Sequence, residues 1–143
     1  MLDLAELRRQ QYAAYHPTFH KPAEGAREAQ RPYFHRLVSS ERHIVLVHDD
    51  AGGVDGFITG QIFPPPPVYD PGGPGCLVDD FVVAPAERWE TVGPLLVDEL
   101  AAESRSAGAV ELIVVCAPED QPKYEMLGAA GLRTVSEWLL RAL

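Results

Sequence analysis

Clusters of basic residues are missing from this 143-residue sequence. Twelve Lys and Arg residues stand against 21 Asp and Glu, which gives a formal net charge of −9, and no run of Lys or Arg occurs. Nucleic-acid binders need a basic face, because phosphate neutralisation supplies most of their affinity. The charge therefore argues against a nucleic-acid-binding protein. It is compatible with a cationic substrate, although an acidic balance also serves solubility alone.

Long apolar runs and cysteine clusters are missing as well. No stretch approaches the roughly 20 apolar residues of a membrane span, and the first residues mix acids and bases where a signal peptide needs an apolar core. We therefore expect a cytoplasmic protein. Cys76 and Cys116 are the only cysteines and have no zinc-ligand spacing, so we expect free thiols and no metal.

The composition is that of a globular chain. Hydrophobic residues make up 46% of the sequence and charged residues 23%, and the length fits one domain over residues 1–143. Pro64–Pro67 favours a stiff, extended conformation. This proline run serves either as a spacer or as a ligand for a proline-binding partner. A single short run is weak evidence for the second role.

Helix and strand patterns alternate along the chain and predict an α/β protein with a mixed sheet. In the first helix, Leu4, Leu7, Ala14 and Tyr15 are expected on the apolar face. A strand, a helix and a strand in the second half give a parallel, right-handed crossover. The expected helices are 2–15, 26–39, Val92–Ala107 and Gln121–Ala130. The expected strands are His43–His48, Val54–Phe63, Cys76–Val83, Val110–Cys116 and Thr134–Leu140.

The most informative segment runs from Cys76 to Gly93. A strand ends at Val83 and a helix is expected to begin near Val92, so Arg88–Gly93 forms the loop before the helix. First-turn amides of a helix have no partner within it and favour an anion. The segment is thus either an anion site or an ordinary connection without a ligand.

Residues 83–93, Val-Ala-Pro-Ala-Glu-Arg-Trp-Glu-Thr-Val-Gly, resemble the acetyl-CoA loop of the GNAT superfamily of N-acetyltransferases. Arg88 stands at that loop's Arg/Gln position and Gly93 at its final small position. The order of elements is similar over nearly the whole chain. The resemblance implies a mostly antiparallel, twisted sheet with splayed central strands and helices on both faces.

The resemblance also implies how acetyl-CoA would bind as a co-substrate. Its pantetheine arm would pair with the backbone of the strand that ends at Val83, and its pyrophosphate would meet amides at the start of the following helix. The expected cofactor-binding residues are Phe81, Val82, Val83, Arg88, Trp89, Thr91, Val92 and Gly93.

Acylation of an amine needs a base for the ammonium proton and an acid for the departing thiolate. Asp79 and Asp80 are neighbours on a strand, so only one of them is expected to face the site. By resemblance to polyamine-type members of the family we take Asp79 as the base. Tyr124, in Lys-Tyr-Glu-Met-Leu-Gly, stands where the family often has its acid. Either residue can instead have a purely structural role.

Three features depart from the family pattern. No strand precedes the first helix, so the first strand is missing or shortened. Thr91 stands where the family usually has glycine. A threonine is tolerated there if the backbone is helical, but not if the position needs a positive φ. Ala117 stands in the loop where the family frequently has Asn, which removes one expected contact to the CoA arm.

The resemblance implies an acetyl-CoA-dependent N-acetyltransferase that transfers the acetyl group directly to a small-molecule or peptide amine. The alternative is a non-catalytic acyl-CoA-binding or regulatory module on the same fold, for which Thr91 and Ala117 speak. The expected partners are acetyl-CoA, the amine and a second copy of the chain, with no nucleic acid and no membrane.

Overall fold

The computed structural model describes residues 1–143. Four strands and four α-helices follow one another, with a short 3-10 turn, η1, before α3. The helices are α1 (Leu2–Tyr15), α2 (Ala26–Val38), α3 (Trp89–Ser106) and α4 (Gln121–Ala129). The strands are β1 (His43–Asp50), β2 (Gly53–Phe63), β3 (Gly75–Val83) and β4 (Glu111–Val114), and η1 spans Ala86–Arg88.

The sheet has the strand order β1-β2-β3-β4. The β1–β2 and β2–β3 pairs are antiparallel and the β3–β4 pair is parallel, which confirms the expected mixed α/β fold. Parallel pairing requires a crossover, and α3 supplies it. Gly108 has φ +86° just after α3, a left-handed conformation that ends helices and favours glycine.

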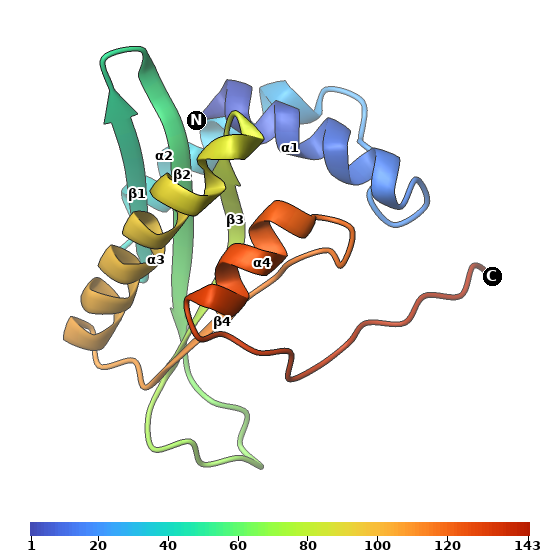
Figure 1. The fold of residues 1–143 in the computed structure, drawn as a ribbon. Helices are drawn as coiled ribbons and strands as arrows, with labels where there is room; N and C mark the ends of the chain where they lie inside the picture. Colours follow the sequence, from blue (N-terminus) through green and yellow to red (C-terminus); the bar gives the residue numbers. More distant parts are fainter.

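Helices cover both faces of the sheet (Figure 1). The larger core lies under α3 and α4 and is centred on Ile58, Phe81 and Leu100. The smaller core lies under α1 and α2 and contains Phe34 and Phe57. Side chains alternate along a strand, so β2 and β3 contribute to both cores and fix the position of all four helices.

The inner face of α1 differs from the expected one. Ala5 and Tyr12 are its buried residues, whereas Leu7 is 49% exposed. Arg8 lies between the two buried residues on the same side and reaches β3. The apolar pattern failed here because polar side chains occupy part of the face that packs on the sheet.

The expected final strand, Thr134–Leu140, is absent. Residues 132–143 have no regular structure, and they run outward from the end of α4 (Figure 1). Trp138 and Leu139 are 84% and 93% exposed. A strand needs a hydrogen-bonded neighbour as well as an apolar pattern, and this segment does not pair with β4, which therefore forms the edge of the sheet.

Cys76 and Cys116 are free thiols, as expected. Burial raises the pKa of both, to about 11 for Cys116. No helix of the structure has both the length and the apolar character that crossing a membrane requires.

Candidate functional site

A β-bulge in β3 forms the base of the site. Ile58 pairs with Phe81 and Gly60 with Val78, so Thr59 on β2 faces both Asp79 and Asp80. Val78 and Phe81 both point into the core under α3. The extra residue of a bulge breaks the alternation, and of the two aspartates only Asp80 lines the cavity beside α1. This agrees with the expectation that only one of them faces the site, but that residue is Asp80 and not Asp79.

The two aspartates differ in burial. Asp80 is buried and its Oδ1 accepts a hydrogen bond from Arg8 Nη1 at 3.1 Å. The carboxylate of Asp79 is exposed, and only its backbone oxygen is bound, by Arg8 Nη2 at 2.8 Å. Burial raises the pKa of the Asp80 carboxyl, and the nearby Arg8 guanidinium opposes that shift. A carboxyl with a raised pKa is suited to proton transfer.

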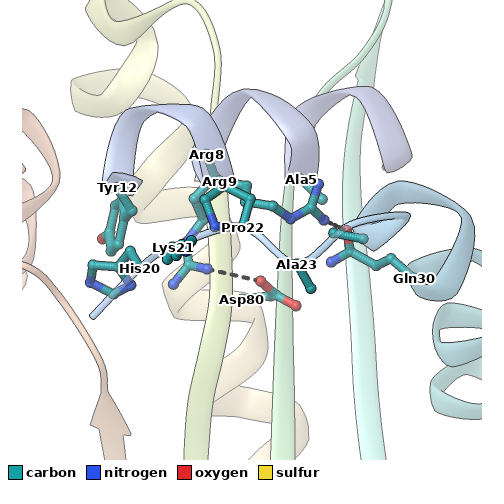
Figure 2. A pocket seen from close by; sticks show the side chains of 11 residues that line it. Ala5, Arg8, Arg9, Tyr12, His20, Lys21, Pro22, Ala23, Gln30 and Asp80 are labelled. Carbon is teal, nitrogen blue, oxygen red and sulfur yellow. Dashed lines mark hydrogen bonds and ion pairs between the residues drawn. The ribbon is translucent and has the colours of Figure 1, made fainter. Parts of the chain in front are cut away.

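Asp80 lines a cavity of about 250 Å³. The cavity lies between α1, the α1–α2 loop and the start of α2, and Asp80 reaches it from β3 (Figure 2). Its other ionisable lining residues are Arg8, Arg9, Tyr12, His20 and Lys21.

Next to this cavity, β3 and β4 separate. Their pairing extends from Gly75 to Val78 on β3, and the last backbone bond runs from the Val115 N–H to the Val78 carbonyl. Beyond it, the Val115 carbonyl accepts a hydrogen bond from Lys123 Nζ at 3.0 Å. The Ala117 N–H donates to the Tyr12 hydroxyl at 3.5 Å. Two side chains thus satisfy backbone groups that a further strand would otherwise use.

Lys123 is completely buried in this gap between β3 and β4. Its ammonium lies 5.5 Å from the centre of the Phe81 ring and 6.0 Å from that of Tyr12. Burial lowers the pKa of Lys123 to about 8, and the Arg8 charge acts in the same direction. An ammonium without a carboxylate bonded to it is costly to bury, which explains the direction of the shift.

Tyr12 and Asp120 complete the buried polar group. The Tyr12 hydroxyl donates to Asp120 Oδ2 at 3.1 Å, and burial raises the pKa of Tyr12 above its usual value. Asp120 is buried as well, and its Oδ1 has no hydrogen-bond partner. The gap between the strands therefore holds a protonated phenol, a lysine and a carboxylate.

The structure does not bring Tyr124 into this gap. Its side chain is 47% exposed, and its hydroxyl lies 2.8 Å from Thr134 Oγ1. Lys123, Met126 and Leu127 form the buried side of α4 instead. The roles of Asp79 and Tyr124 stay predictions, and the geometry favours Asp80 and Tyr12 as the groups next to the gap.

The start of α3 also differs from the expected loop. The helix begins at Trp89, and η1 precedes it, so Val92 and Gly93 already lie inside the helix. Thr91 is helical, as expected for a tolerated side chain, and its hydroxyl donates to the Arg88 carbonyl at 3.2 Å. In an α-helix only the first N–H groups lack an internal partner. The amides of Glu90 and Thr91 are therefore better placed for an anion than those of Val92 and Gly93.

The side chains at this end of α3 are engaged within the protein. Arg88 forms 2.6 Å ion pairs with Asp50 and Asp55 of the β1–β2 hairpin. Trp89 is buried with its ring 4.8 Å from that of Phe81. The Arg88 guanidinium is thus neutralised and adds little positive charge for a phosphate. Phe81, Val82 and Val83 lie beyond the end of β4 pairing, so their backbones border the gap.

A groove of about 780 Å³ lies between the start of α3 and α4. No Lys or Arg lines it. Its four charged lining residues are all acidic: Glu87, Glu90, Asp98 and Glu125. Carboxylates at this spacing repel an anion unless the medium screens them, so the groove is unfavourable for a phosphate.

Gly93 is small for a packing reason. A Cβ at this position would lie 3.0 Å from the Met126 side chain of α4. We expect Gly93→Phe to lower the free energy of unfolding by about 1–3 kcal/mol, because it overpacks the contact between the two helices. Urea denaturation measures this effect. Gly128→Ala on α4 is the control, since a Cβ there meets nothing within 4 Å. Unchanged stability of Gly93→Phe would contradict the contact.

The sequence reasoning missed four residues of the site: Arg8, Tyr12, Asp120 and Lys123. One signal was present. Lys123 shares a helix face with Met126 and Leu127, and a lysine within an apolar stripe indicates an unusual environment. The other three could not be recognised, because they meet only through the packing of α1 against β3 and α4. No group of three or more potential metal ligands occurs in the structure.

At the level of sequence, no family model and no curated protein matches the chain. At the level of structure, the tetramutant of the BH1408 protein from Bacillus halodurans is similar over 99% of this chain and 90% of its own, with TM-score 0.82 and 13% identity. The aminoglycoside 6'-N-acetyltransferase AAC(6')-Ig from Acinetobacter haemolyticus is similar over 82% of this chain and 81% of its own, with TM-score 0.67 and 13% identity.

Glucosamine-6-phosphate N-acetyltransferase from Arabidopsis thaliana is similar over 84% of this chain and 78% of its own, with TM-score 0.61 and 19% identity. These likenesses agree with the mixed sheet and the helices on both of its faces (Figure 1). At such low identity they establish architecture and not activity. The chain has the fold of the GNAT acetyltransferases.

Proposed function

We propose that the protein is an acetyl-CoA-dependent N-acetyltransferase that acts on a small amine. One observation carries the proposal: the gap between β3 and β4 opens directly beside a cavity with a buried carboxylate, Asp80. An acyl donor in the gap and an amine in the cavity would be neighbours. Two reactants held side by side is the first requirement of group transfer.

The acyl arm of acetyl-CoA fits the gap in its hydrogen-bonding pattern. Val115 offers a backbone carbonyl and Ala117 an amide. Lys123 Nζ and the Tyr12 hydroxyl are bonded to them, so the arm must displace both side chains to pair there. An extended arm with amide groups can use such an edge as an additional strand would. When bound, acetyl-CoA supplies an acetyl group activated as a thioester. We assign the backbones of Phe81, Val82 and Val83 to the other wall.

The phosphate half of acetyl-CoA finds less support. The groove beside the start of α3 is acidic, and Arg88 is engaged by two aspartates. First-turn amides at Glu90 and Thr91 are the remaining donors. This departure counts against binding of CoA and so does not separate the enzyme from the non-catalytic alternative. Thr91 does not favour that alternative either, because Thr91 is helical and its side chain bonds to its own backbone turn.

The residues next to the gap suit the two proton movements. Asp80 Oδ1 is bonded to Arg8, whereas Oδ2 has no protein partner and can accept a proton from an ammonium. The Tyr12 hydroxyl lies at the Ala117 amide and so borders the gap. We propose Asp80 as the base and Tyr12 as the proton donor, with Asp79 and Tyr124 as the sequence-based alternatives.

Two of the structural neighbours support the proposal by their ligands. The aminoglycoside acetyltransferase AAC(6')-Iy is known in complex with a bisubstrate analog of CoA and acetylneamine, and in complex with CoA. Its fold is similar to that of this chain over 81% of the residues, with TM-score 0.69. The likeness extends the proposal to this chain by analogy of fold.

Calorimetric titration with acetyl-CoA and an assay of free-thiol release with a panel of amines test the proposal together. We expect weak binding that Glu90→Gln tightens about five-fold, because one repulsive charge is removed next to the phosphates. Glu99→Gln, an exposed residue of α3 outside the groove, is the matched control. Binding without thiol release for any amine would favour the non-catalytic alternative, and absence of binding would exclude both.

A further inference from the structure

We propose that the acceptor is a small amine that also carries an oxyanion, and that the cavity between α1 and α2 binds it; this inference rests on the proposed acetyl transfer. Asp80 would hold the ammonium and the cationic side chains around it the oxyanion. The overall negative charge of the chain is compatible with a purely cationic substrate. The proposed acceptor differs from such a substrate because it also carries a negative group.

The charge balance of the cavity carries the inference. Arg8, Arg9 and Lys21 line it, and Asp80 is its only acidic lining residue. The chain as a whole has the opposite balance, with a net charge of −9. Cations are thus concentrated where the protein has few of them, and Lys21 is one of only two lysines in the sequence.

The three cations are not equally engaged. Arg9 is bound by Glu6 and Gln30. Arg8 is bound by Asp80 (Figure 2) and by the Asp79 carbonyl. Lys21 forms no ion pair and no hydrogen bond through its ammonium, so it is available to a ligand. Arg8 Nε is buried and has no hydrogen-bond partner.

His20 adds no positive charge to this balance. Its ring packs edge-on against Tyr12, with the ring centres 5.1 Å apart. Burial and the Arg8 charge lower the pKa of His20 below its usual value, so it is neutral at pH 7. It forms a wall of the cavity beside the carboxylate.

Size points the same way as charge. The cavity of about 250 Å³ is smaller than the roughly 300–1,000 Å³ of sites for drug-sized ligands. A molecule of amino-acid or amino-sugar size fits, with its amine and its oxyanion a few bonds apart. A long polyamine would place additional positive charges against Arg8 and Lys21, and like charges repel.

The test compares three acceptors in the thiol-release assay: α-amino acids, glucosamine 6-phosphate and spermidine. We expect the anionic amines to have the lower KM. Lys21→Glu should raise their KM roughly ten-fold and lower that of spermidine, because attraction becomes repulsion near the surface. Arg31→Glu, an exposed residue of α2 outside the cavity, changes the net charge equally and should leave each KM within about two-fold.

The outcomes separate the two proposals. A preference for spermidine, or equal effects of Lys21→Glu and Arg31→Glu, would overturn the oxyanion while acetyl transfer stands. If no amine releases thiol, acetyl transfer fails, and ligand-observed NMR without acetyl-CoA then decides on the cavity. If saturation is transferred from the protein to an anionic amine, and Lys21→Glu abolishes this transfer, the result supports the site. If no saturation is transferred to the anionic amine, the site is overturned. If the α-amino acids have the lower KM, the oxyanion is a carboxylate. If glucosamine 6-phosphate has the lower KM, it is a phosphate.

Discussion

Asp80→Asn should lower kcat at pH 7 by about 10²–10⁴-fold, because an amide cannot accept the ammonium proton and a general base contributes by that order. Asp79→Asn should leave kcat within about three-fold, since the Asp79 side chain is exposed and contacts Arg8 only through its backbone oxygen. The two adjacent variants are matched in chemistry and differ in position. Steady-state kinetics with a saturating amine measures the contrast.

The pH dependence identifies the role of Asp80. As the pH rises towards the pKa of the free amine, the acceptor loses its proton unaided, so the deficit of Asp80→Asn should shrink. A residue that only shapes the cavity would leave a deficit that does not change with pH. Asp80→Glu retains a carboxylate and should recover part of kcat, which separates proton transfer from packing.

Loss of the fold does not explain the expected effect. Burial raises the pKa of Asp80, so between its unfolded and folded pKa values the native state binds more protons, and stability falls as the pH rises through that window. The ionised carboxylate is therefore a cost at neutral pH that Asn removes, although Arg8 then loses its partner. Thermal denaturation should show a folded variant. A large deficit in Asp79→Asn instead would restore the sequence-based assignment.

The reliable part of the sequence was its local pattern. Buried apolar runs and helix-ending glycines placed α1–α4 and the four strands, because a segment such as Val92–Leu100 can bury its apolar stripe in only one way. The final strand failed for a non-local reason. Residues 134–140 have a strand-like pattern, but strand formation depends on a neighbouring edge, and that edge belongs to β4, some twenty residues earlier.

The site was less predictable than the fold. A bulge decides where Asp79 and Asp80 point, and it arises from the pairing of β3 with β2 rather than from the residues themselves. The resemblance implied that the strand ending at Val83 separates from the next one, and β3 and β4 do separate beyond Val78. It assigned the acid to Tyr124, whereas the neighbouring Lys123 is the residue that α4 turns inward. A one-residue difference is about 100° on a helix.

Wild type should gain stability relative to Lys123→Met as the pH rises from about 8 to 10. Burial lowers the pKa of Lys123 from 10.5 to about 8. Between these values the unfolded chain still carries the proton and the native chain does not, so the free energy of unfolding rises with pH. The full difference corresponds to about 3 kcal/mol. Methionine has no proton to lose, so the variant lacks this rise.

Two neighbours titrate in the opposite sense. The pKa of Cys116 is raised from 9 to about 11, and that of Tyr12 is raised as well. Their unfolded forms release protons first, so they reduce stability as the pH rises above about 9. The difference between wild type and Lys123→Met removes most of this common background, because both chains contain Cys116 and Tyr12.

Urea denaturation of both proteins at pH 7.5, 8.5 and 9.5 provides the test. Lys21→Met is the control for the chemical change, since Lys21 is exposed. Lys123→Ala should be about 2–5 kcal/mol less stable than Lys123→Met at every pH, because it leaves a cavity and neither side chain titrates. Parallel curves for wild type and Lys123→Met would show that the ammonium is not desolvated. Diverging curves would place a lysine of lowered pKa in the gap beside Tyr12, where the acyl donor is proposed to bind.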